Sequence, residues 1–321
     1  MLYSLREGAL SNTNVMSKLG GTVETEESVD KALAFLGGIQ SEDGRWDLSE
    51  NGGGGNHDMA ATGMALLTFY GRGERHDVNC TYHKTVKKGI NWLIDQQDKS
   101  NGDLRGLNPR GDMYDHGIAG LAMVEAYGVT KDPKLRARAQ SAVDFIEASQ
   151  NKVTGGWRYK AVGDGGFETQ KGDLSVSGWI IMVLGSAQMS GLQVKEETLN
   201  GARRFLREMS GGKHGGSFGY AYGEKPGPNG KSPAMNAVGF FCSQLLGLSN
   251  NSELAMEASS IIDKKGLDVA DLYYAYYGTL ASYQQQGPAW RRWLEAMKEK
   301  LVTAQSEDGS WIAKGPHGGQ M

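Results

Sequence analysis

Cysteine, proline and long apolar runs are all scarce in this sequence of 321 residues. The two cysteines, Cys80 and Cys242, lie far apart without the spacing of a metal site, and they provide no disulfide framework. The longest apolar run, Val176 to Ala187, is shorter than the roughly 18 to 20 residues that a membrane-spanning helix needs. With a net charge of −3 and no basic stripe, nucleic acid is not an expected partner.

Glycine, in contrast, is abundant at 47 residues, and some of it belongs to a motif that recurs along the chain. The stretch Gln40–Trp46 returns near the other end as Gln305–Trp311 with one residue changed. Gln150–Trp157 is a further version, Gln97–Leu104 has leucine in place of tryptophan, and Gly215–Phe218 has lost its glutamine. Self-similarity at a period of tens of residues is typical of a repeat architecture.

The apolar residues between these motifs follow a helical period. Amphipathic helices are predicted at 28–39, 82–96, 134–149, 196–208, 252–263 and 290–304. Helices that are apolar on nearly every face, and therefore buried, are predicted at 58–70, 115–127, 173–189, 235–248 and 270–284. The two kinds alternate strictly, and no stretch has the pattern of a strand.

Alternating helix pairs of this kind either stack into an open solenoid or close into a ring. The inner row of an open solenoid would line a wet surface and carry polar residues, whereas here it is apolar, with Glu125 the main exception. The pattern therefore favours an all-α closed ring with the apolar helices inside. Each apolar helix also carries a glycine in register, which we expect to permit close approach of neighbouring inner helices: Gly63, Gly120, Gly178, Gly239 and Gly278.

Glutamine–tryptophan loops after the outer helices, together with the alternating helices, resemble the repeat superfamily of terpenoid cyclases (squalene–hopene cyclase) and protein prenyltransferases. The resemblance covers roughly residues 28–312. It implies an α/α toroid of five to six helix pairs, in which the motif glutamines and tryptophans tie neighbouring outer helices together.

The domain boundaries follow from the same resemblance. We expect 1–27 to be a polar N-terminal segment and 28–321 to form a single toroid domain, a fragment of a longer protein. A sixth inner helix is missing, so either residues 1–20 take its place or the closing helix is lacking.

The acid motif of triterpene cyclases, Asp-x-Asp-Asp, is absent, and the nearest match, Asp268-Val-Ala-Asp271, has the wrong spacing. The prenyltransferases hold zinc with Asp, Cys and His, but neither Cys80 nor Cys242 is placed for such a site. We therefore expect no metal and no cofactor.

Polar residues at the starts of the inner helices should converge at one end of the ring. They supply the catalytic candidates, which are His57, Asp58, Asp115, His116, Asp173 and Asp271. Asp58, Asp115 and Asp173 each lie five residues before an in-register glycine, and this recurrence favours helix capping over catalysis. His57 and His116 break the repeat and are better functional candidates, although a hydrogen-bonded structural histidine is the competing interpretation.

Aromatic residues of the inner helices are the candidates for binding an apolar substrate, with core packing as the competing interpretation. They are Tyr114, Trp179, Phe240, Tyr273 and Tyr277. The resemblance implies a cyclase-like or prenyltransferase-like domain that binds or converts an isoprenoid-like ligand in the central cavity. A non-catalytic scaffold or binding module and a glycan-active toroid are the alternatives. The sequence does not decide whether the domain is an enzyme, nor does it indicate localisation or oligomeric state.

Overall fold

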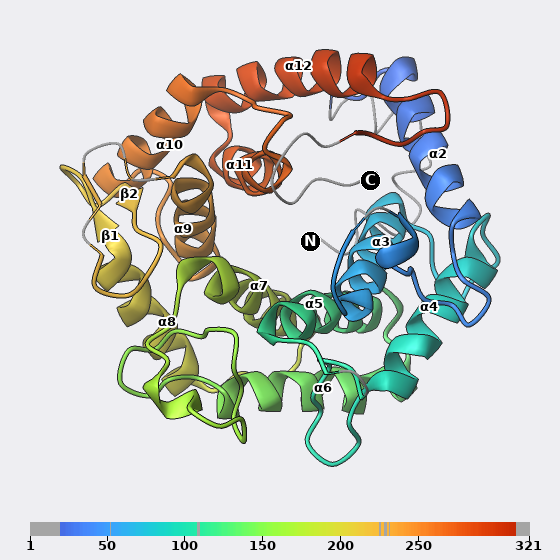
Figure 1. The fold of residues 1–321 in the computed structure, drawn as a ribbon. Coiled ribbons are helices and arrows are strands. Elements are labelled where there is room, and N and C mark those ends of the chain that lie inside the picture. The colour runs from blue at the N-terminus through green and yellow to red at the C-terminus, as the bar shows by residue number, and fades with distance from the viewer. Residues whose placement is uncertain are drawn as a thin grey trace.

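The structure is a computed structural model, which describes residues 20–51, 53–107, 110–224, 226–227, 230 and 232–312. It is an all-α ring, as the sequence predicts, and Figure 1 shows the outer and inner helices alternating around it. The outer helices are α2 (Val23–Gly38), α4 (His83–Gln96), α6 (Pro133–Ala148), α8 (Glu196–Met209), α10 (Glu253–Lys265) and α12 (Gly287–Ala304). The inner helices are α3 (Asp58–Arg72), α5 (Met113–Thr130), α7 (Leu174–Ser190), α9 (Pro233–Leu245) and α11 (Leu272–Gln285).

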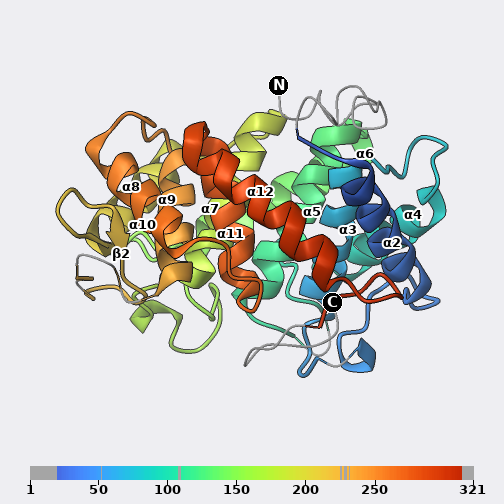
Figure 2. The same ribbon diagram turned by 90° about the horizontal axis from the view of Figure 1, so that it is seen from above.

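Burial separates the two rows as their sequences predict. Every residue of α5 from Met113 to Val129 is buried except Tyr114, whereas α8 buries a single face that includes Leu199, Ala202 and Phe205. Figure 2 shows α12 lying across the outside of the ring in front of α11. Among the helices that the structure describes, none has the length and hydropathy needed to span a membrane. Residues 1–19 lie outside the described part, so their place as a sixth inner helix stays a prediction.

The first helix begins earlier than the sequence analysis placed it. Thr22 caps α2 by accepting a hydrogen bond from the backbone of Thr25, and the Thr25 hydroxyl reciprocates in a capping box. Ser28, the predicted cap, lies inside the helix and is buried. Glutamates in the first turn favour this earlier start through the helix dipole.

Glutamine side chains join each outer helix to the next at four loops. In every case Nε2 donates to the carbonyl of a glycine in its own loop and to a carbonyl of the following outer helix, over 2.8–3.1 Å. The sets are Gln40 with Gly44 and Thr85, Gln97 with Gly102 and Arg138, Gln150 with Gly155 and Thr198, and Gln305 with Gly309 and Ser28. The last set links α12 back to α2 and closes the ring.

The tryptophans of the motif make a different connection. The indole Nε1 of Trp46, Trp157 and Trp311 donates to a carbonyl of the preceding outer helix, at Leu36, Ile146 and Leu301 respectively. The indole therefore fastens the loop to its own helix, and the glutamine makes the hydrogen bonds to the next one. Gln97 makes both of its bonds although its motif has no tryptophan.

The in-register glycines of the inner helices serve more than one purpose. A Cβ on Gly63 would lie 2.9 Å from the carbonyl oxygen of Ile118, and one on Gly178 would lie 2.5 Å from Val238, so close helix approach explains these two. Gly239 and Gly278 instead make room for Phe218 and Trp293, which belong to a loop and an outer helix. Gly120 has no neighbour closer than 3.8 Å, and Gly117 is the tight position of α5. The prediction of inner-helix approach is thus wrong for three of the five glycines.

The fifth loop, which lacks the glutamine, is built differently. Two antiparallel strands of two residues each, β1 (Ser210–Gly211) and β2 (Ser217–Phe218), form a short hairpin where the sequence predicted no strand. The Glu257 carboxylate of α10 accepts hydrogen bonds from the backbone N–H groups of Lys213, His214 and Gly216, over 2.7–2.9 Å. A side chain of the next outer helix thus replaces the missing glutamine.

Candidate functional site

A histidine and a buried aspartate pair at the end of the ring where the inner helices begin. His57 precedes α3, Asp115 lies in the first turn of α5, and 2.8 Å separates Nδ1 from the Asp115 carboxylate. The Asp115 side chain is 0% exposed and that of His57 is 43% exposed. The same carboxylate accepts hydrogen bonds from the backbone N–H groups of Ala60 and Asp112, which fix its orientation.

Burial and charge shift the pKa of both partners. Burial raises the pKa of Asp115 above its usual range, although the hydrogen bond and charge of His57 act against this. Burial also opposes the charged form of His57, but the Asp115 carboxylate, aided by Asp112 and Asp58, outweighs it and raises the pKa of His57. Both shifts favour the protonated form of the side chain concerned. Nε2 of His57 has no hydrogen-bond partner within the described ranges and is the accessible atom of the pair.

Asp112 completes a small group of ligand-type side chains. His57, Asp112 and Asp115 each contribute one atom, and these atoms all lie within 4.8 Å of one another. Asp112 caps α5 by accepting the N–H of Tyr114, and Asp115 reciprocates as the third residue of a capping box. A cation would compete with these N–H donors for the same oxygens.

Both ring nitrogens of His116 are engaged by backbone groups, which indicates a structural role. Its Nδ1 accepts the backbone N–H of Leu104 at 3.0 Å, and its Nε2 lies 3.1 Å from the Ala142 carbonyl. This pattern assigns a neutral ring with the proton on Nε2. Thr62, Ser177 and Asn236 accept an N–H from the corresponding loop residue in the same way.

These equivalent contacts give a repeat register that differs from the one read from the sequence. Counting four residues back from each acceptor aligns Asp58 with Asp112 and Asp173, not with Asp115. Asp115 therefore breaks the repeat, and His116 follows it.

The remaining acidic candidates are tied to helix starts. Asp58, in the first turn of α3, accepts the N–H of Leu48 and lies 3.3 Å from Arg45. Asp173 caps α7 through the N–H of Val176, and burial raises its pKa. Asp271 caps α11. Asp115 and Asp173 are the two that are fully buried, together with His116.

The aromatic candidates divide by burial. Trp179, Phe240 and Tyr277 lie in the core at 2% exposure or less, whereas Tyr114 and Tyr273 are half-buried. Tyr276, which the sequence analysis did not single out, is 38% exposed in mid-helix and stacks on Trp179 with a centroid distance of 5.3 Å. No pattern in the sequence distinguishes Tyr276 from the buried tyrosines beside it on α11, so its exposure could be found only in the structure.

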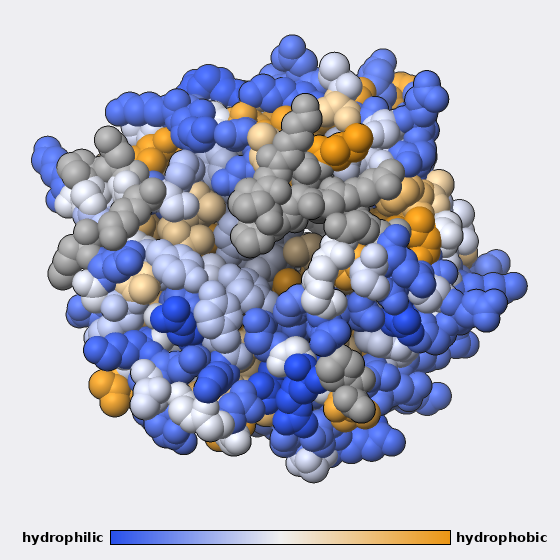
Figure 3. All heavy atoms as spheres, in the orientation of Figure 1, coloured by the Kyte–Doolittle hydropathy of each residue, from blue (hydrophilic) through white to orange (hydrophobic). Residues whose placement is uncertain are grey.

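A second inner helix also carries an exposed apolar side chain. Met64, in mid-helix on α3, is 42% exposed. Figure 3 shows a hollow in the middle of this face of the molecule with hydrophobic atoms at its base. Mid-helix Met64 and Tyr276 supply exposed apolar surface on α3 and α11, the first and last inner helices along the chain.

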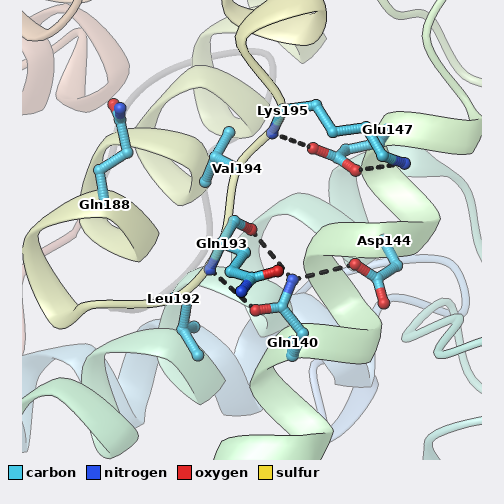
Figure 4. A pocket seen from close by; sticks show the side chains of 8 residues that line it. All are labelled: Gln140, Asp144, Glu147, Gln188, Leu192, Gln193, Val194 and Lys195. Atoms are coloured by element: carbon cyan, nitrogen blue, oxygen red, sulfur yellow. Dashed lines mark hydrogen bonds and ion pairs between the residues drawn. The ribbon is translucent and has the colours of Figure 1, made fainter.

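A second hollow lies on the outer rim, between α6 and the loop that follows α7. It has a volume of about 540 Å³ and is lined mainly by polar residues. Figure 4 shows that these side chains bond to one another: Gln140 exchanges hydrogen bonds of 3.0 and 2.9 Å with the backbone of Gln193, and Glu147 binds Lys195. These contacts hold the loop after α7 against α6, and they occupy the polar groups of Gln140, Glu147 and Lys195.

Comparison with known proteins shows the fold. No protein-family model matches the sequence, and no curated protein matches it. A type II terpene cyclase from Scytonema, solved as an Asp-to-Ala variant in complex with its product merosterolic acid A, superposes with a TM-score of 0.60 at 14% identity, covering 90% of this chain and 82% of that one. A protein from Actinoplanes superposes with a TM-score of 0.57 at 17% identity, covering 89% and 82%. The chain therefore has the toroid fold seen in a terpene cyclase.

Proposed function

We propose that the domain binds an isoprenoid-like ligand in the centre of the ring and transfers a proton to it through the His57–Asp115 pair. The observation that carries this proposal is an accessible imidazole backed by a fully buried carboxylate, at the end of the ring where the inner helices begin. The terpene cyclase with the same fold binds a terpenoid product, which supports the ligand class. As part of this proposal, we place the domain with the squalene–hopene cyclases and protein prenyltransferases that its sequence resembles.

The chemistry of the pair limits the substrate. A carboxylate that accepts Nδ1–H orients the ring and stabilises the imidazolium, so that Nε2 can donate a proton. An imidazolium is too weak an acid to protonate an isolated alkene. A terminal epoxide is a better match, because its oxygen is basic and its ring is strained.

The proposed step balances as an isomerisation. The proton moves from Nε2 of His57 to the epoxide oxygen as one C–O bond breaks. The π electrons of a neighbouring double bond form the new C–C bond. The resulting cation then loses a proton to water, and Nε2 of His57 takes up a proton from water again. The electron-rich faces of aromatic rings such as Tyr276 stabilise positive charge along the way.

The alternatives have less support. A glycan-active toroid would present exposed tryptophans in a polar groove, yet all seven tryptophans are buried or half-buried. A non-catalytic binding module would bind the ligand without a need for a histidine whose pKa is raised by a buried acid. The binding module remains the second candidate, and the experiment below distinguishes it from an enzyme.

The test uses the terminal epoxide of farnesol, with farnesol as the ligand that lacks the reactive group. We expect wild-type protein to bind both and to convert only the epoxide to a cyclic isomer, detected by gas chromatography with mass spectrometry. His57→Gln and Asp115→Asn should retain binding and lose roughly 100-fold or more in turnover, the usual contribution of general acid catalysis.

A matched control is His83→Gln, which removes a histidine of an outer helix far from the site in sequence. Binding without turnover in wild-type protein would favour the binding module. Absence of binding to either ligand would refute the proposal.

A further inference from the structure

Four tyrosines gather beside the His57–Asp115 pair, on the other side of the first turn of α5. The hydroxyl of Tyr114 donates to Ser175 at 2.5 Å, and Ser175 donates to Asp173 at 2.7 Å. Tyr273 donates to the Ser175 carbonyl at 3.2 Å. We call Tyr114, Tyr159, Tyr220 and Tyr273 the tyrosine cluster.

The loop tyrosines of the cluster are held in place by their own backbone. The Tyr159 carbonyl accepts the N–H of Met113, the first residue of α5, at 3.0 Å. The Tyr220 carbonyl accepts the N–H of Leu174, the first residue of α7, at 2.8 Å. The two hydroxyls then lie 3.0 Å apart. Each ring is therefore oriented before any ligand arrives.

Some hydrogen-bond donors and acceptors of the tyrosine cluster have no partner among the described residues. Tyr114 has given its proton to Ser175, so its oxygen can only accept. In the Tyr159–Tyr220 pair one hydroxyl donates to the other, which leaves one O–H proton of the pair without an acceptor among the described residues. The cluster thus offers several tyrosine oxygens that can accept a hydrogen bond and one O–H proton that is free to donate. A hydroxyl group, which both donates and accepts, is the complement of this set.

Asp173 adds an independent sign of an unfilled site. Its side chain is fully buried, and its Oδ2 has no hydrogen-bond partner among the described residues, although such groups are usually paired. Arg158 lies 3.7 Å from that oxygen and balances its charge. With the charges matched and only one donor free, the cluster suits a neutral group and not an anion.

We propose that the tyrosine cluster binds the hydroxyl group of an isoprenoid alcohol and so determines which end of the ligand faces His57. This inference rests on the proposed function, since it names the polar group of the ligand bound there. The apolar chain would fold against the exposed surfaces of Tyr276 and Met64, and this fold brings the terminal epoxide at its other end back to His57.

The experiment compares the affinities of farnesol and farnesene, which share a carbon skeleton and differ in the hydroxyl group. We expect wild-type protein to bind farnesol about three- to tenfold more tightly, the effect of one or two hydrogen bonds. Tyr114→Phe should abolish most of that preference while leaving the affinity for farnesene unchanged. Tyr283→Phe, which changes a partly exposed tyrosine of α11 outside the cluster, should keep the preference.

The outcomes separate this inference from the proposed function. Equal affinity of wild-type protein for both ligands, or a preference that survives in Tyr114→Phe, overturns the role of the tyrosine cluster and leaves isoprenoid binding intact. Binding of neither ligand overturns both. Thermal unfolding of each variant, together with farnesene binding, shows whether a lost preference comes from a lost fold. Ser175→Ala provides a second variant, because it removes the acceptor that orients the Tyr114 hydroxyl.

Discussion

Gln305 donates a hydrogen bond to the carbonyl of Ser28 over 2.8 Å, although 277 positions separate the two residues in the sequence. The bond joins the loop after α12 to α2 and so connects the last outer helix to the first. The same glutamine holds the Gly309 carbonyl at 2.9 Å. Three other loops use the same pair of glutamine hydrogen bonds to join consecutive outer helices. The ring is therefore closed by the same contact that joins its other outer helices.

Removal of these glutamine side chains should destabilise the ring according to their burial. Gln150→Ala leaves two carbonyls without a donor in a buried setting and should cost about 2–4 kcal/mol, whereas Gln305→Ala, at a half-buried position, should cost about 1–2 kcal/mol. Urea unfolding followed by circular dichroism measures both. Equal losses would show that burial does not set the strength of these contacts.

The glycine of the same loop should be irreplaceable for a separate reason. Gly155 has φ +84°, and a Cβ there would lie 2.0 Å from the Gly201 carbonyl oxygen of the next outer helix. Gly155→Ala should therefore cost roughly 2–5 kcal/mol, from backbone strain and overlap together. Gly163, with φ +88° and no neighbour within 4 Å, is the matched control. Gly163→Ala should cost about 1–2 kcal/mol from strain alone, and a similar loss at both sites would contradict the role of close approach.

The ring and its helices could be predicted from sequence because apolar periodicity reports directly on burial. Six amphipathic and five apolar segments became outer and inner helices with ends within a few residues of prediction. The Glu257 contact could not be predicted, because it replaces a loop side chain with one from a distant helix. Two-residue strands such as β1 are too short for any periodic signal.

The candidate site was predicted in part. His57 and Asp115 do come together from two helix starts, whereas Asp58, Asp173 and Asp271 are each tied to their own helix start. The register was misread because α5 contains both Gly117 and Gly120. Counting from Gly120 made Asp115 look like a repeated cap and His116 look unique. The hydrogen bond from Leu104 to His116, equivalent to that from Trp46 to Thr62, reverses this reading. The sequence offered the clue in Gly117, which follows His116 as Gly63 follows Thr62.

The fifth loop should respond to acid more strongly than the glutamine loops. Three backbone N–H groups, opposed by burial, lower the pKa of Glu257. A carboxyl with a lowered folded-state pKa contributes stability above its unfolded pKa, and this contribution is lost as pH falls through the folded-state value. The same loop also holds His214 beside Glu253 of α10, with 3.2 Å between Nδ1 and the carboxylate.

We expect the free energy of unfolding to fall more between about pH 5 and pH 3 in wild-type protein than in Glu257→Gln, whose side chain does not titrate. Glu253→Gln serves as the control for the His214 pair. Parallel pH profiles for wild-type protein and Glu257→Gln would show that the carboxylate is not what holds this loop.

The effect of Asp115 on His57 should be measurable as a change in the pKa of the His57 imidazole. Because the buried carboxylate outweighs the desolvation of the ring, the folded-state pKa of His57 is raised. A raised histidine pKa contributes stability that is full below the unfolded pKa and is lost as pH rises through the folded-state value. Wild-type protein should therefore lose stability between slightly acidic and mildly alkaline pH relative to His57→Gln.

Nuclear magnetic resonance of the imidazole measures the same effect directly. In Asp115→Asn the pKa of His57 should fall, since only the charges of Asp112 and Asp58 then oppose the desolvation of the ring. Asp58→Asn, a more distant contributor of charge, should lower it only slightly. If Asp58→Asn produced the larger shift, or if Asp115→Asn produced none, the buried aspartate would not be the group that sets the proton affinity of His57, and proton transfer from Nε2 would lose its physical basis.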